Sequence, residues 1–276
     1  MAALGRAIRA LFRTAVWIAF LGVVSLGLYA GYLIKVLDVS RASIEARARS
    51  VEASVVPSRA AGPQGAYYDT ALEVPLSLAP ERIPDFVRNA FITREDQFFR
   101  WHPGFNPISI YRAMRANAER APGASGGLAG GSTITQQLVK NLLLSQEQTL
   151  DRKFNEIILA VIVEFLFTKD ELLAMYLNTA YFGAGAYGIE AAARRFFGRS
   201  VGYEPKLNML EAAMLAHSVR SPSRLNPLSQ REVLKERAQA LIAEMAAQGY
   251  GTDAGQAARR PGGDSGLIGP RARPPR

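Results

Sequence analysis

Hydrophobic and polar positions along the chain follow patterns that predict helices almost everywhere. Between Ala15 and Ile34 no residue is charged, and this stretch has the roughly 20 residues that a helix needs to cross a bilayer. Beyond residue 80, apolar residues recur at helical spacing, and little of the period-2 alternation of half-buried strands is present. The pattern predicts a mainly α protein with one N-terminal transmembrane helix.

The region after residue 80 is expected to contain a series of helices with short connections. They are predicted at 84–100, 107–119, 134–144, 152–167, 169–178 and 190–197. Two further helices should begin at sequences that resemble capping boxes, Asn208-x-x-Glu211 and Ser229-x-x-Glu232. The stretch 157–163 is apolar on every side, which is typical of a helix buried in a core.

These elements divide the chain into five segments. We expect a cytoplasmic tail (1–14), a transmembrane anchor (15–34), a juxtamembrane linker (35–80), a globular domain (81–250) and a disordered tail (251–276). The linker should start with a polar helix over 40–55, and the tail is rich in Gly, Pro and Arg, with few apolar residues for a core. A cleaved signal peptide is the alternative for the anchor, but its apolar region of about 7–15 residues would be shorter and no Ala-x-Ala site is evident.

Charge and composition narrow the class of partner. The net charge of +9 would suit nucleic acid, a membrane surface or lipid phosphates. The anchor favours the last two, and no nucleic-acid motif or alternation of aromatic and basic residues is present. Two isolated histidines and no cysteine make no zinc site. The sequence therefore predicts a membrane-bound protein with no zinc site and no nucleic-acid partner.

Candidate chemistry lies in four ordered blocks within the globular domain. The second block begins at the end of a Gly-rich loop (121–131) that leads into a helix start, where free backbone N–H groups could face an anion. No Gly-Lys-Ser/Thr follows, so it is not a P-loop. The blocks are Glu95-Asp96-x-x-Phe99-x-x-His102-x-Gly104, GGSTITQQ (130–137) running on to Lys140-Asn141, Arg152-Lys153-x-x-Glu156, and Lys169-Asp170-Glu171-Leu172-Leu173-x-x-Tyr176-Leu177-Asn178.

This order of blocks closely resembles the family 51 glycosyltransferases, the peptidoglycan transglycosylases that occur alone or as the first domain of class A penicillin-binding proteins. The resemblance covers roughly residues 84–250. It implies a lysozyme-like fold with a smaller membrane-facing subdomain. The implied reaction polymerises lipid II, with the nascent glycan as the second substrate and undecaprenyl pyrophosphate as the leaving group.

The resemblance assigns roles to the motif residues. Glu95 matches the family's catalytic glutamate, which would act as the general base on the acceptor hydroxyl. Glu156 matches the second essential glutamate, and Arg152 and Lys153 share its helix face at i,i+4 and i,i+3, where they could neutralise the pyrophosphate. The remaining candidates for substrate binding are Asp96, His102, Ser132, Thr133, Thr135, Gln136, Gln137, Lys140 and Asn141. On a continuing helix, Asp96 would point about a quarter turn away from Glu95, which favours a supporting role. No cofactor is expected, and assistance by a divalent cation is left open.

Three positions depart from the family pattern. Asn106 stands where an aspartate is usual and is followed by Pro107, a good helix start with either residue. Ala174 replaces a common glutamate, and Arg94 precedes the catalytic glutamate in place of a small residue, where its charge would act on that carboxylate. His217, in an apolar pattern, is expected to be structural.

The charges that flank the anchor and the length of the following domain bear on the orientation of the protein in the membrane. Positive charges before and after the anchor are nearly balanced, so the charge rule alone does not decide the orientation. Long following domains translocate largely regardless of charge, and we therefore place the N-terminus in the cytoplasm. The catalytic domain would then face the periplasm or exterior of a bacterial inner membrane, near membrane lipids and other cell-wall synthesis proteins. No second domain with a Ser-x-x-Lys nucleophile follows, which favours a monofunctional enzyme over a truncated bifunctional one. A lytic hydrolase and a catalytically weak glycan-binding scaffold are the competing functions.

Overall fold

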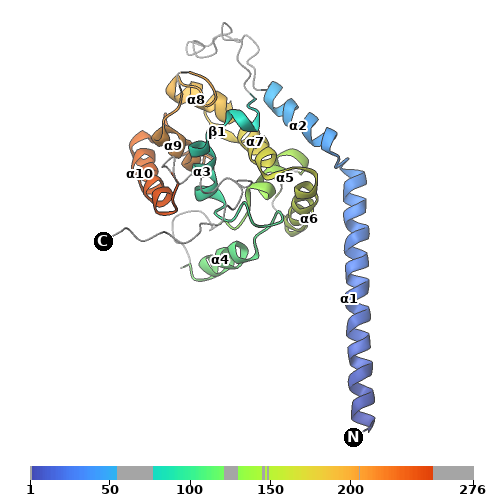
Figure 1. Ribbon diagram of the computed structural model, residues 1–276. Coiled ribbons are helices and arrows are strands. Elements are labelled where there is room, and N and C mark those ends of the chain that lie inside the picture. The colour runs from blue at the N-terminus through green and yellow to red at the C-terminus, as the bar shows by residue number, and fades with distance from the viewer. Residues whose placement is uncertain are drawn as a thin grey trace, which may run out of the picture.

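The computed structural model describes residues 2–54, 77–120, 130–204 without 145, 146 and 148, and 206–250. A long helix stands beside a globular body of shorter helices (Figure 1). The expected disordered tail (251–276) and most of the Gly-rich loop lie outside the described residues.

The long helix is α1 (Ala2–Val36), and it contains the expected anchor. Its segment Phe12–Val36 is long and apolar enough to cross a membrane, and only 6% of its most apolar window is buried inside the structure. A turn at Leu37 and Asp38 then leads into α2 (Arg41–Ser54), so the polar helix expected after the anchor is confirmed. The anchor touches the globular body near its C-terminal end, where the Tyr29 hydroxyl donates to Asn155 Oδ1 at 2.8 Å.

The globular body is mainly α, as the hydrophobic pattern predicts. Its only sheet within the described residues is a two-stranded antiparallel hairpin of β1 (Tyr181–Gly183) and β2 (Ala186–Tyr187). The helices are η2 (Pro80–Arg82), α3 (Asp85–Glu95), α4 (Pro107–Ala118), α5 (Ile134–Leu143), α6 (Leu150–Leu166), α7 (Lys169–Thr179), α8 (Ile189–Phe197), α9 (Met209–Ser218) and α10 (Arg231–Ala247).

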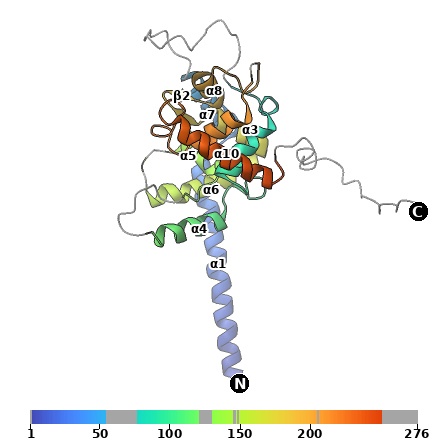
Figure 2. The same cartoon turned by 90° about the vertical axis from the view of Figure 1, so that its left-hand side faces the viewer.

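Two packed groups of helices form the body. Helix α7 lies against α5, α2 and α8, while α9 packs on α3 and α10. Large side chains that are fully buried join the groups, among them Phe91 of α3, Tyr176 of α7 and Phe182 of β1. Helix α4 lies apart from this core, on the side that faces the N-terminal end of α1 (Figure 1, Figure 2).

Helix starts follow the local sequence at some sites and not at others. Thr133, Thr168 and Asn208 each form a complete capping box, which confirms the prediction for α9. The capping box predicted at Ser229 is wrong: α10 begins at Arg231 after Gln230, which has no side-chain cap. The Ser229 hydroxyl instead donates to backbone carbonyl groups of the preceding turn.

The stretch 157–163 of α6 has no exposed residue: Leu159, Ala160 and Val163 are buried and the other four residues are partly buried. Exposed side chains flank this stretch, with Phe154 52% and Phe165 85% exposed. One face of α6 packs on α5 and its N-terminal half touches α1, with Phe154 stacked on Tyr29. The apolar composition of α6 therefore reflects contacts with a neighbouring helix and with the anchor as well as with the core.

Gly104 allows the loop after α3 to pack closely on α6. Its φ is +97°, and a Cβ atom there would lie 2.6 Å from the backbone carbon of Ala160. We expect Gly104→Ala to lower the free energy of unfolding by about 2 kcal/mol or more, because backbone strain and overpacking each cost about 1–3 kcal/mol. Thermal unfolding in detergent measures this change.

Gly185→Ala is the matched control, since its φ of +78° is also unfavourable but no atom lies within 4 Å of the added Cβ. Gly185→Ala should lower the free energy of unfolding by less than Gly104→Ala does. Equal losses of unfolding free energy in the two variants would mean that backbone strain alone accounts for the loss and that the close contact with α6 adds nothing.

Candidate active site

Glu95 is the last residue of α3 and is held from two sides. Its Oε1 accepts a hydrogen bond from Arg220 Nε at 2.9 Å, and its Oε2 accepts one from Gln137 Nε2 at 3.2 Å. Tyr176 fixes Gln137 in turn, because its hydroxyl donates to Gln137 Oε1 at 3.2 Å. Burial, and after it the Glu95 carboxylate, raise the pKa of the Tyr176 hydroxyl well above its ordinary value, so this donor keeps its proton. The side chain of Glu95 is only 2% exposed and points in one fixed direction.

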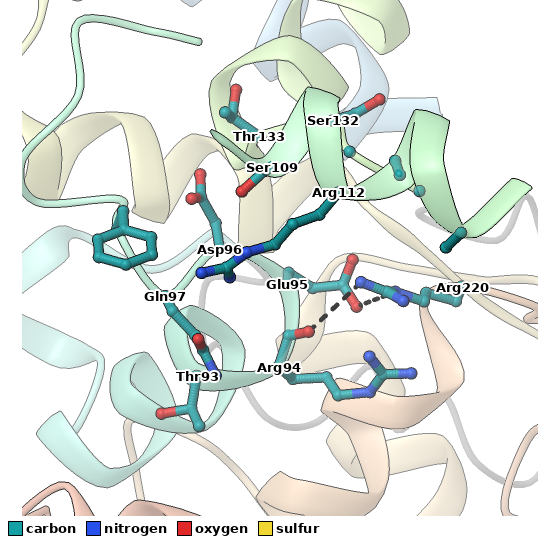
Figure 3. Close-up of a pocket in the computed structure, with 15 residues that line it drawn as sticks. Thr93, Arg94, Glu95, Asp96, Gln97, Ser109, Arg112, Ser132, Thr133 and Arg220 are labelled. Carbon is teal, nitrogen blue, oxygen red and sulfur yellow. Dashed lines mark hydrogen bonds and ion pairs between the residues drawn. The ribbon is translucent and has the colours of Figure 1, made fainter. Parts of the chain in front are cut away.

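A cavity of about 300 Å³ opens beside Glu95 (Figure 3). It lies between the end of α3, the inner face of α4 and the segment 130–133 that leads into α5. Its polar lining is rich in cations and hydroxyl groups: Thr93, Arg94, Glu95, Asp96, Gln97, Ser109, Arg112, Ser132, Thr133 and Arg220. A carboxylate at the wall of a cationic cavity suits a reaction between a hydroxyl group and an anionic substrate.

Asp96 and His102 form a buried pair behind this wall. Helix α3 ends at Glu95, not near residue 100 as expected, and Asp96 is extended with φ −159°. Its Oδ2 accepts from the backbone N–H of Ile134 at 3.0 Å and from His102 Nε2 at 2.9 Å. His102 Nδ1 accepts from the backbone N–H of Gly104, so Nε2 carries the proton. Asp96 thus joins the loop after α3 to the start of α5.

The GGSTITQQ segment divides into residues that face the cavity and residues that lie beneath it. Ser132 and Thr133 line the cavity. The Thr133 hydroxyl also donates to the carbonyl of Gly104 at 2.6 Å. Thr135 and Gln136 are fully buried, with Thr135 bonded to Glu164 and Gln136 bonded to the Thr133 N–H. Their placement favours support of the site over contact with a substrate.

Three cations surround Glu156 on the other side of Ser132. Lys153 Nζ donates to Glu156 Oε2 at 2.7 Å and to Ser132 Oγ at 2.8 Å, and Arg152 pairs with Glu156 Oε1. Lys140 of α5 lies close enough to interact with these charges, and burial lowers its pKa below the ordinary value. Glu156 is only 3% exposed, so one buried carboxylate holds the cations together. The cluster keeps a net positive charge and is suited to an anion. Asn141, the next residue on α5, is exposed.

Arg152 also carries a polar atom that has no partner. Its Nε is buried and makes no hydrogen bond within the described residues. Buried polar groups in proteins are nearly always hydrogen-bonded. The unmet donor in a cation cluster is consistent with an anionic ligand.

Sequence reasoning named Gln137 but missed Arg220, the cation that pairs with Glu95, and Arg112 of the cavity lining. Arg220 lies in the turn after α9, 125 residues from Glu95, and no spacing rule connects them. Arg112 of α4 lies outside all four blocks and also lines the cavity. Tyr176 belongs to the fourth block, but only the structure brings it to Gln137.

Arg94 interacts with Glu95 through its charge, while its hydrogen bond goes elsewhere. Its Nε donates to His217 Nδ1 at 2.9 Å, and His217 Nε2 lies 3.1 Å from the carbonyl of Arg237. Burial, and after it the Arg94 guanidinium, lower the pKa of His217 to about 4, so the ring is neutral at pH 7. The cation that forms an ion pair with Glu95 is Arg220. His217 has the structural role predicted for it.

The other two departures from the family pattern lie away from Glu95. Asn106 caps α4, as predicted, by accepting from the N–H groups of Ile108 and Ser109 at 3.0 and 3.1 Å. Ala174 is buried in α7 and lines a different cavity of about 260 Å³ between α2 and α7. Neither position lines the cavity of Glu95. Among the described residues, no three His, Cys, Asp or Glu side chains gather as a metal site would require.

Comparison with known proteins identifies related sequences. Residues 72–246 match a family model described as Transglycosylase. Penicillin-binding protein 1A of Aquifex aeolicus is 42% identical over 170 residues, which are 62% of this chain and 22% of that protein. Penicillin-binding protein 1A/1B of Bacillus subtilis is 43% identical over 173 residues, 63% of this chain and 18% of the relative. Penicillin-binding protein 1A of Escherichia coli is 40% identical over 185 residues, which are 67% of this chain and 21% of that protein. The chain spans about a fifth of the length of these relatives.

Proposed function

The chain belongs to the transglycosylase family, and we propose on this premise that it is a membrane-anchored peptidoglycan glycosyltransferase. It would polymerise lipid II into β-1,4-linked glycan strands and release undecaprenyl pyrophosphate. The observation that carries this proposal is the position of Glu95, a buried carboxylate at the wall of a cationic cavity that adjoins a second cation cluster through Ser132.

Glu95 is the proposed general base. The 4-hydroxyl of the acceptor sugar attacks the anomeric carbon of the donor, an O–C bond forms, and the bond from that carbon to the pyrophosphate oxygen breaks. The hydroxyl proton moves to Glu95, because a sugar hydroxyl is a poor nucleophile until a base removes its proton. A single displacement inverts the anomeric carbon, so an α-linked donor gives a β-linked product.

The cluster around Glu156 is the proposed site of the leaving group. Pyrophosphate departs as a stable anion and needs neutralising charge more than a proton donor. Arg152 can grip phosphate oxygens in a bidentate fork, while Lys153 and Lys140 act as point charges. Glu156 is then the residue that positions the cations, and the unmet Nε of Arg152 is a donor for the same anion.

The remaining motif residues support these two sites in our proposal. Gln137 orients Glu95, and Asp96 with His102 fixes the start of α5. Ser132 and Thr133 would contact substrate at the junction of the two sites, and Asn141 is exposed beside Lys140. Thr135 and Gln136 hold the segment from below.

The domain organisation follows from the same premise. We propose a cytoplasmic tail, a span within α1 and a catalytic domain over 81–250 that acts on the outer side of the bacterial inner membrane. Its partners would be lipid II, the nascent glycan, membrane lipids and other cell-wall synthesis proteins.

A polymerisation assay tests the proposed function. The full chain in detergent is incubated with labelled lipid II, and the products are separated by size. Polymer supports a glycosyltransferase. Binding of lipid II without polymer would favour the scaffold reading, and cleavage of preformed glycan would favour a lytic hydrolase.

The anchor should matter when substrate and enzyme share a bilayer. Deleting residues 1–35 should lower the rate on lipid II in liposomes by about 10-fold or more, since tethering in one membrane raises the effective concentration. Activity in detergent should be retained, because Glu95 and Glu156 lie beyond the deletion. The measurement is the ratio of the two rates for the deleted and full chains.

A deletion of residues 1–27 is the matched control. It removes most of the span but keeps Tyr29, which bonds to Asn155 and stacks on Phe154 of α6. Both deletions should lower the rate on lipid II in liposomes by a similar factor. If both keep the full rate in liposomes, the anchor contributes nothing to turnover.

A further inference from the structure

The corner between the anchor and α2, residues 33–47, is packed into the globular body. Leu33 near the end of α1, Val39 in the turn and Ile44 of α2 are 5%, 5% and 1% exposed, and all three belong to the hydrophobic core. The sequence predicted a juxtamembrane linker from residue 35, but its first part shares a core with the catalytic helices. Because protein interiors are close-packed, side chains buried on both sides of a turn restrict the angle between its two helices.

The backbone of the corner is hydrogen-bonded as well. Asp38 has a φ of 49°, in the left-handed region that aspartate tolerates better than most residues. The N–H of Val39, the next residue, donates to the carbonyl of Ile34 at 2.9 Å. A left-handed residue followed by such a bond is a common way to close the C-terminus of a helix. The chain therefore leaves the anchor in one defined direction.

Arg47 joins α2 to the ends of two other helices. Its Nη2 donates to the carbonyl of Leu37 at 2.7 Å, and its Nη1 donates to the carbonyl of Leu142 at 3.4 Å. Leu37 directly follows α1, and Leu142 lies in the last turn of α5. A cation is favourable at both places, since the last carbonyl groups of a helix lack partners within it. Arg47 thus ties the end of the anchor to α5, the helix that carries Gln137 and Lys140.

Arg41 makes the corresponding contact with α6 and α7. Its Nη1 donates to the carbonyl of Leu166, the last residue of α6, at 2.9 Å. Its guanidinium pairs with Glu171 of α7 and lies 4.7 Å from the ring centre of Phe167. The side chain of Arg41 is 49% exposed, so this ion pair should contribute less than the contacts of Arg47.

The anchor meets the body a second time, about two helical turns before the corner. The Tyr29 hydroxyl donates to Asn155, and the Tyr29 ring stacks on Phe154. Figure 1 shows α1 running beside α6 before the chain turns into α2. Two attachments, one on each side of the corner, resist both tilting and rotation of the body about the anchor.

We propose that the corner holds the catalytic body at one fixed height and angle on its anchor, with Arg47 and Arg41 as positioning residues. The anchor is then a rigid support and not only a tether. The proposal rests on the proposed function, because a fixed support keeps Glu95 and the cluster around Glu156 at a constant distance from the bilayer that holds a lipid-linked substrate. Misplacement of reacting groups by about 1 Å can lower a rate by about 10²-fold.

A distance measurement in liposomes tests the rigid support without turnover. The chain has no cysteine, so spin labels attach only where cysteines are introduced. Val23→Cys labels the anchor and Glu232→Cys labels α10, at side chains that are 70% and 82% exposed. Double electron–electron resonance on the full chain should give one narrow distance distribution. A flexible Gly-Ser insert of about six residues between Asp38 and Val39 should broaden it by about twofold or more.

Turnover of labelled lipid II tests what the fixed height is used for. The insert leaves the anchor and the proposed catalytic residues in place, so a mere tether predicts the wild-type rate. The rigid support predicts a rate about 10-fold or more lower in liposomes and a retained rate in detergent, where no bilayer sets the height.

Arg47→Gln should lower the liposome rate by about threefold or more, because it removes the cation at both helix ends, and Arg47→Lys should recover most of this loss. Arg49→Gln is the matched control, since Arg49 lies on the same helix, is 65% exposed and pairs with Glu45 at 3.7 Å. It should keep both rates. An equal loss in detergent and in liposomes for Arg47→Gln would make Arg47 a residue that only stabilises α5.

The results separate this proposal from the proposed function. A narrow distribution in a wild type that makes no polymer means that the proposed function fails and the rigid support stands. A distribution in the wild type as broad as that of the insert variant overturns the rigid support. A broadened distribution with an unchanged liposome rate shows that the fixed height contributes nothing to turnover and overturns its proposed use.

Discussion

Replacing Glu95 with Gln should lower the rate of lipid II polymerisation by about 10²–10⁴-fold, the usual contribution of a general base. The amide keeps the size of the carboxylate and can still accept from Arg220. It cannot take up the proton of the acceptor hydroxyl.

Initial rates on labelled lipid II in detergent measure this loss, and thermal unfolding checks that the variant is folded. Glu232→Gln is the control, since Glu232 is 82% exposed on α10 and does not line the cavity. It should keep the wild-type rate. Polymer formation by folded Glu95→Gln at near the wild-type rate would remove Glu95 from its proposed role.

Lys153→Ala should lower kcat/KM for lipid II by about 10–100-fold, because hydrogen bonds to charged groups are worth about 1.5–3 kcal/mol. The change removes the bonds to Ser132 and Glu156 and one cation of the proposed pyrophosphate site. The side chain of Lys153 is 38% exposed, so the melting temperature should fall only slightly.

Steady-state kinetics and thermal unfolding are measured together for this variant. Lys235→Ala is the control, because Lys235 is 49% exposed and its ion pair among the described residues is the one with Glu232 at 4.0 Å. It should change neither quantity. A large drop in melting temperature with normal turnover of the folded fraction would make Lys153 a structural residue.

The helices could be predicted from sequence because their signals are local. Asn106 before Pro107 and the pair Asn208 and Glu211 act within one turn, and α4 and α9 begin where they indicate. The end of α3 has no such signal. Asp96 leaves the helix because its carboxylate bonds to the start of α5, a contact between residues 38 positions apart.

Only those residues of the candidate site that lie in the sequence motifs could be predicted. Glu95, Arg152, Lys153 and Glu156 are found by their order and spacing. Arg220 and Arg112 approach Glu95 because α9 and α4 pack around the end of α3, and neither has a pattern in the sequence that marks it. Arg94 shows the opposite case: it neighbours Glu95 in sequence, but its side chain turns to His217.

The anomeric configuration of the product tests the central claim most directly. The full chain is incubated with α-linked lipid II, and the new glycosidic bond is assigned from the coupling constant of its anomeric proton. The account predicts a polymer whose new bonds are all β, formed by single displacement with Glu95 as the base. Polymer with α bonds, or the absence of polymer from folded enzyme, would contradict it.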